Sequence, residues 1–308
     1  MISHNGEAYT IFDAHTHFAG DSSRYDVTLT ALFDKLRGKY PFHLQRVGRD
    51  PSTLVQYLDR VGVDVVCVLA EEGPPTNYSV DCSFILGYAA QAPHRVLPIG
   101  NINHRIETSV EHRVRGLIVG GIRGFKQYYA DHNQNPYEDR LTPLYELCSD
   151  HRLPILFHCG THSRYYMTNH QYGEPLLYER LFEKYPDIPF VMCHGGKGGH
   201  HEQCVALLRA HPNTYIEISD ISRSALEWMC PEDLAERFLF GTDMPQFPDY
   251  GPLVKIVFDL PLSAPSKHKI FHDNAARIFG LGRPHVAVSA LSSSLAPLHE
   301  LVGRFDVT

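Results

Sequence analysis

Short apolar runs alternate with longer amphipathic stretches along most of the chain. The runs are rich in Val, Ile and Phe and are bounded by Gly, Pro or polar clusters, which is typical of buried strands. The pattern predicts strands at 9–12, 63–69, 96–100, 121–125, 153–157, 190–193, 214–218 and 238–240. Helical patterns lie between them, at 52–61, 83–91, 107–115, 141–151, 175–185, 202–211 and 253–260.

Strands that alternate with helices favour parallel βαβ units, and eight such units predict an α/β fold of the (β/α)8 TIM-barrel type. We expect one barrel domain over 1–283 and a C-terminal helical extension over 284–308. Residues 19–50 form a long polar insertion after the first strand, which predicts a lid. Residues 266–279 predict a further helix on the outside of the barrel.

Composition narrows the class of protein. The net charge of -7 gives no basic surface for nucleic acid, and we find no basic run for anionic membranes. The N-terminus lacks the features of a signal peptide, and no stretch reaches the ~18 apolar residues of a membrane span. The seven cysteines form no C-x-x-C pair. We therefore expect a cytoplasmic protein that acts on a small molecule.

Histidines and one aspartate follow four of the predicted strands. Asp13, His15 and His17 follow one another at intervals of two residues, so they point to the same face of a strand. The same alternation pairs Leu156 with His158, Met192 with His194, and Leu239 with Asp243. Residues at the carboxyl ends of barrel strands converge at one mouth, and imidazole and carboxylate suit Zn²⁺, Fe²⁺ or Mn²⁺. The pattern predicts a divalent metal site, with Zn²⁺ as the expected ion.

The sequence also resembles a known family. The matching segments are FDAHTH, GIRGFK, PILFHCG, the P-x-F-V-M-C-H-G-G run, FLFGTDMP and HDNAARIFGL. From Ile11 to about Leu281 the chain resembles the amidohydrolase superfamily, in particular the amidohydrolase-related branch that includes metal-dependent aminocarboxymuconate-semialdehyde and resorcylate decarboxylases.

The resemblance implies roles for the matching residues. His15, His17 and His158 match metal-binding positions. Asp243 matches the last-strand carboxylate, which binds metal and accepts a proton. His194 matches a residue that acts on the substrate or on the metal's water; a further metal ligand is its alternative role.

Several cationic side chains complete the candidate site. Lys126 has three interpretations: a contact to a substrate carboxylate, a carboxylated bridge between two metals, or an ion pair with a nearby acid. Arg123, His162 and Arg164 are candidate substrate contacts, and for His162 and Arg164 a solvated loop is an equal alternative.

Three functions remain open at this point. The first is a metal-dependent hydrolase of an amide, lactone or similar carbonyl bond, in which Asp243 moves a proton and His194 stabilises an oxyanion. The second is a metal-dependent, non-oxidative decarboxylase of an unsaturated or aromatic acid. The third is a non-catalytic binding protein on the same fold. A homodimer is compatible with the apolar tail.

Overall fold

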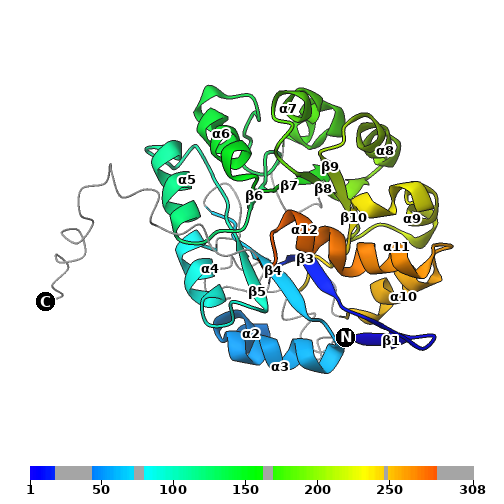
Figure 1. Ribbon diagram of the computed structural model, residues 1–308. Helices are drawn as coiled ribbons and strands as arrows, with labels where there is room; N and C mark the ends of the chain where they lie inside the picture. The colour runs from blue at the N-terminus through cyan, green and yellow to red at the C-terminus, as the bar shows by residue number, and fades with distance from the viewer. Residues whose placement is uncertain (18–43, 73–79, 162–168, 246–248, 283–308) are drawn as a thin grey trace, which may run out of the picture.

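The computed structural model describes residues 1–17, 44–72, 80–161, 169–245 and 249–282. In these ranges a ring of helices surrounds parallel strands, with the N-terminal β1 beside the ring (Figure 1). The predicted extension at 284–308 and most of the predicted lid lie outside the described residues. The part of the lid that is described, from Leu44 to Arg49, is a helix.

The strands of the ring belong to two sheets. The three-stranded sheet contains β3 (Phe12–Thr16), β4 (Val65–Leu69) and β5 (Val96–Ile99). The five-stranded sheet contains β6 (Phe125–Gln127), β7 (Ile155–Gly160), β8 (Phe190–Lys197), β9 (Thr214–Glu217) and β10 (Phe238–Leu239). Every neighbouring pair within them is parallel.

Hydrogen bonds join the two sheets at both edges. At one edge Gly100, after β5, forms a parallel bridge with Phe125 of β6. At the other edge the backbone N–H of Asp243 donates to the carbonyl oxygen of His15 at 2.8 Å. The strands thus follow one another around a ring, in agreement with the TIM-barrel prediction.

The two faces of the ring bury different side chains. In β4, Cys67 and Leu69 pack with side chains from the other strands in an interior cluster. Val66 and Val68 point the other way and pack with the helices. This period of two explains why the strands read as continuous apolar runs, since both faces are buried.

The helices that cover the ring are mostly those that the pattern predicts. In chain order they are α2 (Leu44–Arg49), α3 (Pro51–Val61), α4 (Cys82–Ala89), α5 (Val110–Val119), α6 (Thr142–His151), α7 (Glu179–Lys184), α8 (His201–Ala210), α9 (Arg223–Met229), α10 (Gly251–Asp259), α11 (Ala264–His268) and α12 (Asn274–Ile278). Short 3-10 segments are η3 (Asp139–Leu141), η4 (His170–Gly173), η5 (Pro175–Tyr178) and η6 (Glu232–Arg237), and η7 (Lys269–Asp273) is a π-helical turn between α11 and α12. None of the described helices is long and apolar enough to cross a membrane.

The helix predicted at 266–279 was expected on the outside of the barrel, but the structure places it elsewhere. Ala275, Ile278 and Phe279 pack into the interior cluster, next to Phe12 at the start of β3. Figure 1 shows α12 in orange across one end of the ring. This segment therefore closes the amino-terminal end of the barrel, because small and apolar side chains follow each other at helical spacing there.

Two strand boundaries and one hairpin also differ from prediction. Tyr9 belongs to β2 (Glu7–Tyr9), which pairs antiparallel with β1 (Ile2–His4), so the first barrel strand begins only at Phe12. Asn5 and Gly6 between them both have positive φ. An Asn-Gly pair is a strong hairpin signal that the apolar pattern overlooked. The fourth barrel strand begins at Phe125, later than predicted.

Asp13 joins the first barrel strand to the segment after the last one. Its buried carboxylate accepts hydrogen bonds from the Thr242 backbone N–H at 3.0 Å and from the Thr242 hydroxyl at 2.6 Å. The alternation predicted that Asp13 would share a face with His15. It does not, because the register of β3 against β4 shifts between Asp13 and Thr16.

We predict that Asp13→Ala lowers the free energy of unfolding by about 3 kcal/mol, because it leaves two buried donors of Thr242 without an acceptor. Asp13→Asn, which keeps one acceptor oxygen, should lose less. Urea denaturation measures both, and an unchanged midpoint for Asp13→Ala would contradict this role.

Candidate metal centre

Three ligand atoms form a compact triangle at the carboxyl ends of the strands. His15 Nε2, His17 Nε2 and Asp243 Oδ1 each lie 3.3 Å from the other two. Ligands bonded at about 2.05 Å in tetrahedral geometry are about 3.3–3.4 Å apart. The spacing of these atoms therefore fits a shared metal ion.

His158 and His194 complete the group. The ring centroids of His158 and His194 are 4.6 Å apart, and those of His15 and His194 are 5.1 Å apart. One ligand atom each from His15, His194 and Asp243 lies within 4.8 Å of the others. The structure thus brings together all the histidines predicted for the metal site and Asp243.

A left-handed backbone turn directs His194 into the site. The expected alternation paired it with Met192, but Met192 packs on the outer face and Cys193 on the inner one. His194 itself has a φ of 62°, and Gly195 and Gly196 that follow it also have positive φ. Because only glycine adopts this conformation readily, the Gly-Gly pair makes the turn possible.

Lys126 points into the same group of side chains. Its Nζ lies 3.3 Å from His15 Nε2 and 5.4 Å from the centre of the Tyr128 ring, and the residue is 1% exposed. Lys126 Nζ is thus as close to His15 Nε2 as the other two atoms of the triangle are. This contact places Lys126 beside the metal ligands, where it can bridge metals or meet a bound substrate.

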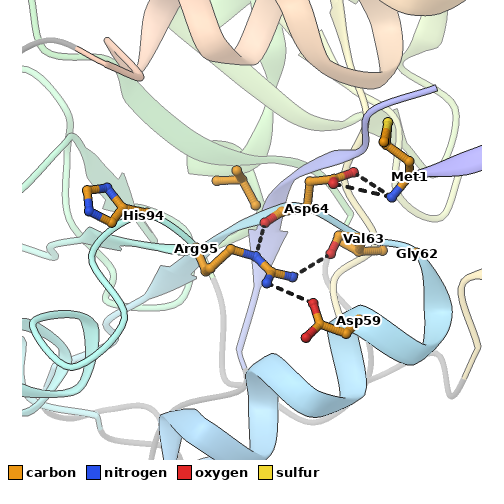
Figure 2. A pocket seen from close by; sticks show the side chains of 8 residues that line it. Met1, Asp59, Gly62, Val63, Asp64, His94 and Arg95 are labelled. Atoms are coloured by element: carbon orange, nitrogen blue, oxygen red, sulfur yellow. Dashed lines mark hydrogen bonds and ion pairs between the residues drawn. The ribbon is translucent and has the colours of Figure 1, made fainter. Parts of the chain in front are cut away.

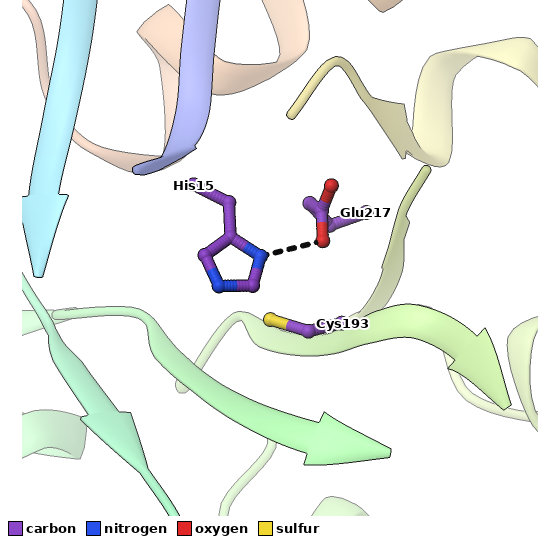
Figure 3. Close-up of side chains that lie close together, drawn as sticks. All are labelled: His15, Cys193 and Glu217. Carbon is purple, nitrogen blue, oxygen red and sulfur yellow. Dashed lines mark hydrogen bonds and ion pairs between the residues drawn. The ribbon is translucent and has the colours of Figure 1, made fainter. Parts of the chain in front are cut away.

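Glu217 belongs to the site and was missed by the sequence reasoning. Its Oε2 lies 2.8 Å from His15 Nδ1, and Figure 3 shows it beside His15 and Cys193. Such a carboxylate fixes the ring so that Nε2 faces the metal. A signal existed, because Glu217 is the one charged residue within the strand predicted at 214–218.

The charges around the triangle favour a cation. Burial raises the pKa of Asp243, but His15, His17 and His194 outweigh it and hold this pKa far below its usual range. A carboxylate held ionised so firmly suits metal ligation better than proton uptake.

The pKa of His15 also indicates that the electrostatic potential in the site is negative. Burial and Lys126 lower the pKa of His15, yet Cys193, Asp243 and Glu217 together raise it to about 10. The metal-free site thus attracts a proton that a metal ion would displace.

Arg123, a predicted substrate contact, does not join the site. Arg123 precedes β6, and its backbone N–H bonds to Pro98 O, so it lies towards the amino ends of the strands. His162 and Arg164 lie outside the described residues. Of the two predicted substrate or bridging residues that the structure describes, Lys126 lies in the site and Arg123 does not.

A surface cavity of about 340 Å³ lies at the opposite end of the strands (Figure 2). Arg95 organises it: its guanidinium lies 2.8 Å from Asp59 Oδ1 and donates to Val63 O at 3.0 Å. Because Val65 and Val96 begin their strands here, the cavity is at the amino ends. Active sites of such barrels form at the carboxyl ends, so we assign it no catalytic role.

Tyr128 lies between the site and another buried histidine, His132. Its ring centroid is 6.4 Å from that of His17 and 5.6 Å from that of His132. His132 is fully buried, and neither ring nitrogen has a hydrogen-bond partner among the residues that the structure describes. Burial, assisted by the charge of His104, lowers the pKa of His132 to about 3. It is therefore neutral near pH 7.

A barrel that gathers histidines, a carboxylate and a lysine at the carboxyl ends of its strands has the architecture of a barrel enzyme with a candidate metal site. The family comparison agrees. The profile of the amidohydrolase family matches residues 12–281, so the chain belongs to this family. A comparison with curated protein sequences finds no match.

Solved structures share the fold at low identity. An uncharacterised TIM-barrel protein from Bordetella bronchiseptica is 19% identical with a TM-score of 0.70, over 89% of this chain and 100% of that one. 2,6-Dihydroxybenzoate decarboxylase from Rhizobium is 15% identical with a TM-score of 0.67, over 90% and 100%. A dihydroxybenzoic acid decarboxylase from Polaromonas, with bound manganese and 2-nitroresorcinol, is 17% identical with a TM-score of 0.66, over 90% and 98%.

We predict that protein purified without chelators holds about one equivalent of a divalent metal, in the single-site geometry of the triangle. His15→Ala and Asp243→Ala should lose it, as measured by inductively coupled plasma mass spectrometry. About two equivalents would instead make Lys126 a carboxylated bridge and contradict a one-metal site.

We also predict that His132 makes the protein less stable in mild acid. Below its ordinary pKa the unfolded chain takes up a proton that folded His132 does not bind, so stability falls as pH falls. At pH 5 this effect is about 2 kcal/mol for a pKa lowered from 6.5 to about 3.

His132→Leu removes this effect. Between pH 7.5 and pH 5 the variant should therefore lose about 2 kcal/mol less unfolding free energy than the wild type, measured by urea denaturation. His112→Leu, at an exposed position, is the control and should follow the wild type. If the unfolding free energies of His132→Leu and the wild type fell by the same amount between pH 7.5 and pH 5, the effect of His132 would be ruled out.

Proposed function

We propose that the protein is a metal-dependent decarboxylase, which releases carbon dioxide from an aromatic or unsaturated carboxylic acid without oxidation. The observation that carries this proposal is the position of Lys126. Its buried Nζ lies 3.3 Å from His15 Nε2, directly beside the metal ligands.

A cationic side chain here matches an anionic substrate. Charges interact strongly in a buried site, so an ammonium fixed beside the metal ligands attracts a carboxylate or phenolate. A neutral amide or lactone has no charge to pair with it. The charge of Lys126 therefore favours an acid as the substrate.

The similar solved structures support this choice by analogy. Two of those described above are named as dihydroxybenzoate or dihydroxybenzoic acid decarboxylases, and one of them holds manganese. At 15–17% identity they share the fold with this chain, so the argument rests on the site residues.

The metal would be held by His15, His17, His158 and Asp243. When bound, it supplies a Lewis acid that polarises a substrate oxygen or acidifies water. Nitrogen and oxygen ligands suit Zn²⁺, Mn²⁺ and Fe²⁺, and the manganese in a similar structure favours Mn²⁺ over our first expectation of Zn²⁺.

The chain's own residues would orient the acid and handle one proton. The bond between the substrate carbon and the carboxylate breaks, and the carboxylate leaves as carbon dioxide. The electron pair of that bond stays on the substrate carbon, which receives a proton that comes from solvent water. Lys126 pairs with the negative charge of the substrate. His194 lies next to the ligands and can take up a proton and return it to the carbon.

Hydrolysis of an amide or lactone is the second candidate, and membership of the amidohydrolase family favours it. The same ligands serve both reactions. Product analysis separates them: wild-type protein loaded with metal is incubated with hydroxybenzoates and lactones. Carbon dioxide release supports decarboxylation. Ring-opened product without carbon dioxide would show that the protein is a hydrolase instead.

We predict that Lys126→Met lowers kcat/KM for the acid by about 100-fold while metal content stays unchanged, because a buried charge loses its partner. Lys126→Arg, which keeps the positive charge, should recover part of the activity. Loss of metal in Lys126→Met would show that the residue is a ligand or bridge instead.

A further inference from the structure

Ser219 lies between Glu217 and His194 and contacts both. Its hydroxyl oxygen is 2.9 Å from Glu217 Oε2 and 2.8 Å from His194 Nδ1. The backbone N–H of Ser219 also donates to Glu217 Oε1 at 2.6 Å. Glu217, Ser219 and His194 are all buried.

Counting protons fixes the direction of these bonds. Backbone N–H groups can only donate, and those of Ser219 and His194 reach Oε1 and Oε2 of Glu217 at 2.6 and 3.4 Å. Glu217 therefore acts as an acceptor. The single hydroxyl proton of Ser219 goes to this carboxylate, so the hydroxyl oxygen must accept from His194 Nδ1.

We propose that Ser219 and Glu217 are positioning residues that hold His194 as the tautomer protonated on Nδ1. Nε2 of His194 then presents a lone pair to the metal site. A carboxylate that orients a histidine ring and selects its tautomer is a known device of general-base catalysis. In this site the hydroxyl of Ser219 lies between the carboxylate of Glu217 and the ring of His194.

The tautomer decides what His194 can do. A lone pair on Nε2 accepts a proton or binds a metal. It does not supply the N–H that stabilisation of an oxyanion by His194 requires, which was our expectation for a hydrolase. The claim that His194 transfers a proton rests on the proposed function. The claim about the tautomer of His194 is independent of that function.

Glu217 also couples two parts of the site. The same oxygen, Oε2, contacts His15 Nδ1 at 2.8 Å and the hydroxyl of Ser219 at 2.9 Å. One buried carboxylate thus orients a metal ligand and, through Ser219, the neighbouring His194. A change at Glu217 should affect metal binding and the His194 tautomer together, whereas a change at Ser219 should affect the tautomer alone.

The test is long-range ¹⁵N–¹H NMR on the full chain, labelled at histidine and freed of metal. The His194 signals are identified by their absence in His194→Gln. We expect wild-type His194 to be protonated on Nδ1, Ser219→Ala to shift it towards protonation on Nε2, and Ser219→Thr, which keeps a hydroxyl, to restore the wild-type state.

Metal binding provides the second readout. Glu217→Gln should weaken the affinity for Mn²⁺ or Zn²⁺ by about 10–100-fold, whereas Ser219→Ala should leave it near the wild-type value. Wild-type His194 protonated on Nε2, or an unchanged tautomer in Ser219→Ala, would overturn the proposal. The wild-type spectrum by itself shows which tautomer His194 adopts, even if a variant does not fold. No substrate is involved, so a failed decarboxylase assay leaves this result intact.

Discussion

The backbone contact between the first and last barrel strands is the constraint on which the site depends. Asp243 N bonds to His15 O, and His17 N bonds to Met244 O at 2.6 Å. These bonds bring two ends of the chain into register, so that residues far apart in sequence share one triangle of ligand atoms. The buried bonds from Thr242 to Asp13 hold the same contact from the outer side.

The contact between the first and last barrel strands brings charged side chains together in a buried site, and their burial explains the chemistry of that site. Two buried carboxylates, Asp243 and Glu217, lie among histidines and the buried Lys126. Unpaired charges are costly in such surroundings, and the observed hydrogen bonds compensate only part of the cost. A bound divalent cation would balance the carboxylates, which is the physical reason why this group of residues is a candidate metal site.

Local strain and function coincide at the same positions. His194 and Asp243 both have positive φ, at 62° and 55°. Residues other than glycine adopt this conformation at some cost, and it persists where the surroundings hold it. Here Ser219 binds the ring of His194 and His15 binds the backbone of Asp243. The strain aims both side chains into the mouth of the barrel.

The sequence by itself determined the eight strand-and-helix units and the types of ligand, because burial on both faces leaves apolar runs and strand ends leave polar residues. It did not reveal that α12 closes the barrel or that Arg123 lies away from the site. His194 was expected in the site through alternation, whereas a left-handed turn puts it there. Only the tertiary structure decided the partnership of His15 with Glu217, 202 positions away, and of Ser219 with His194. Such contacts join distant strands through single side chains, and no local period encodes them.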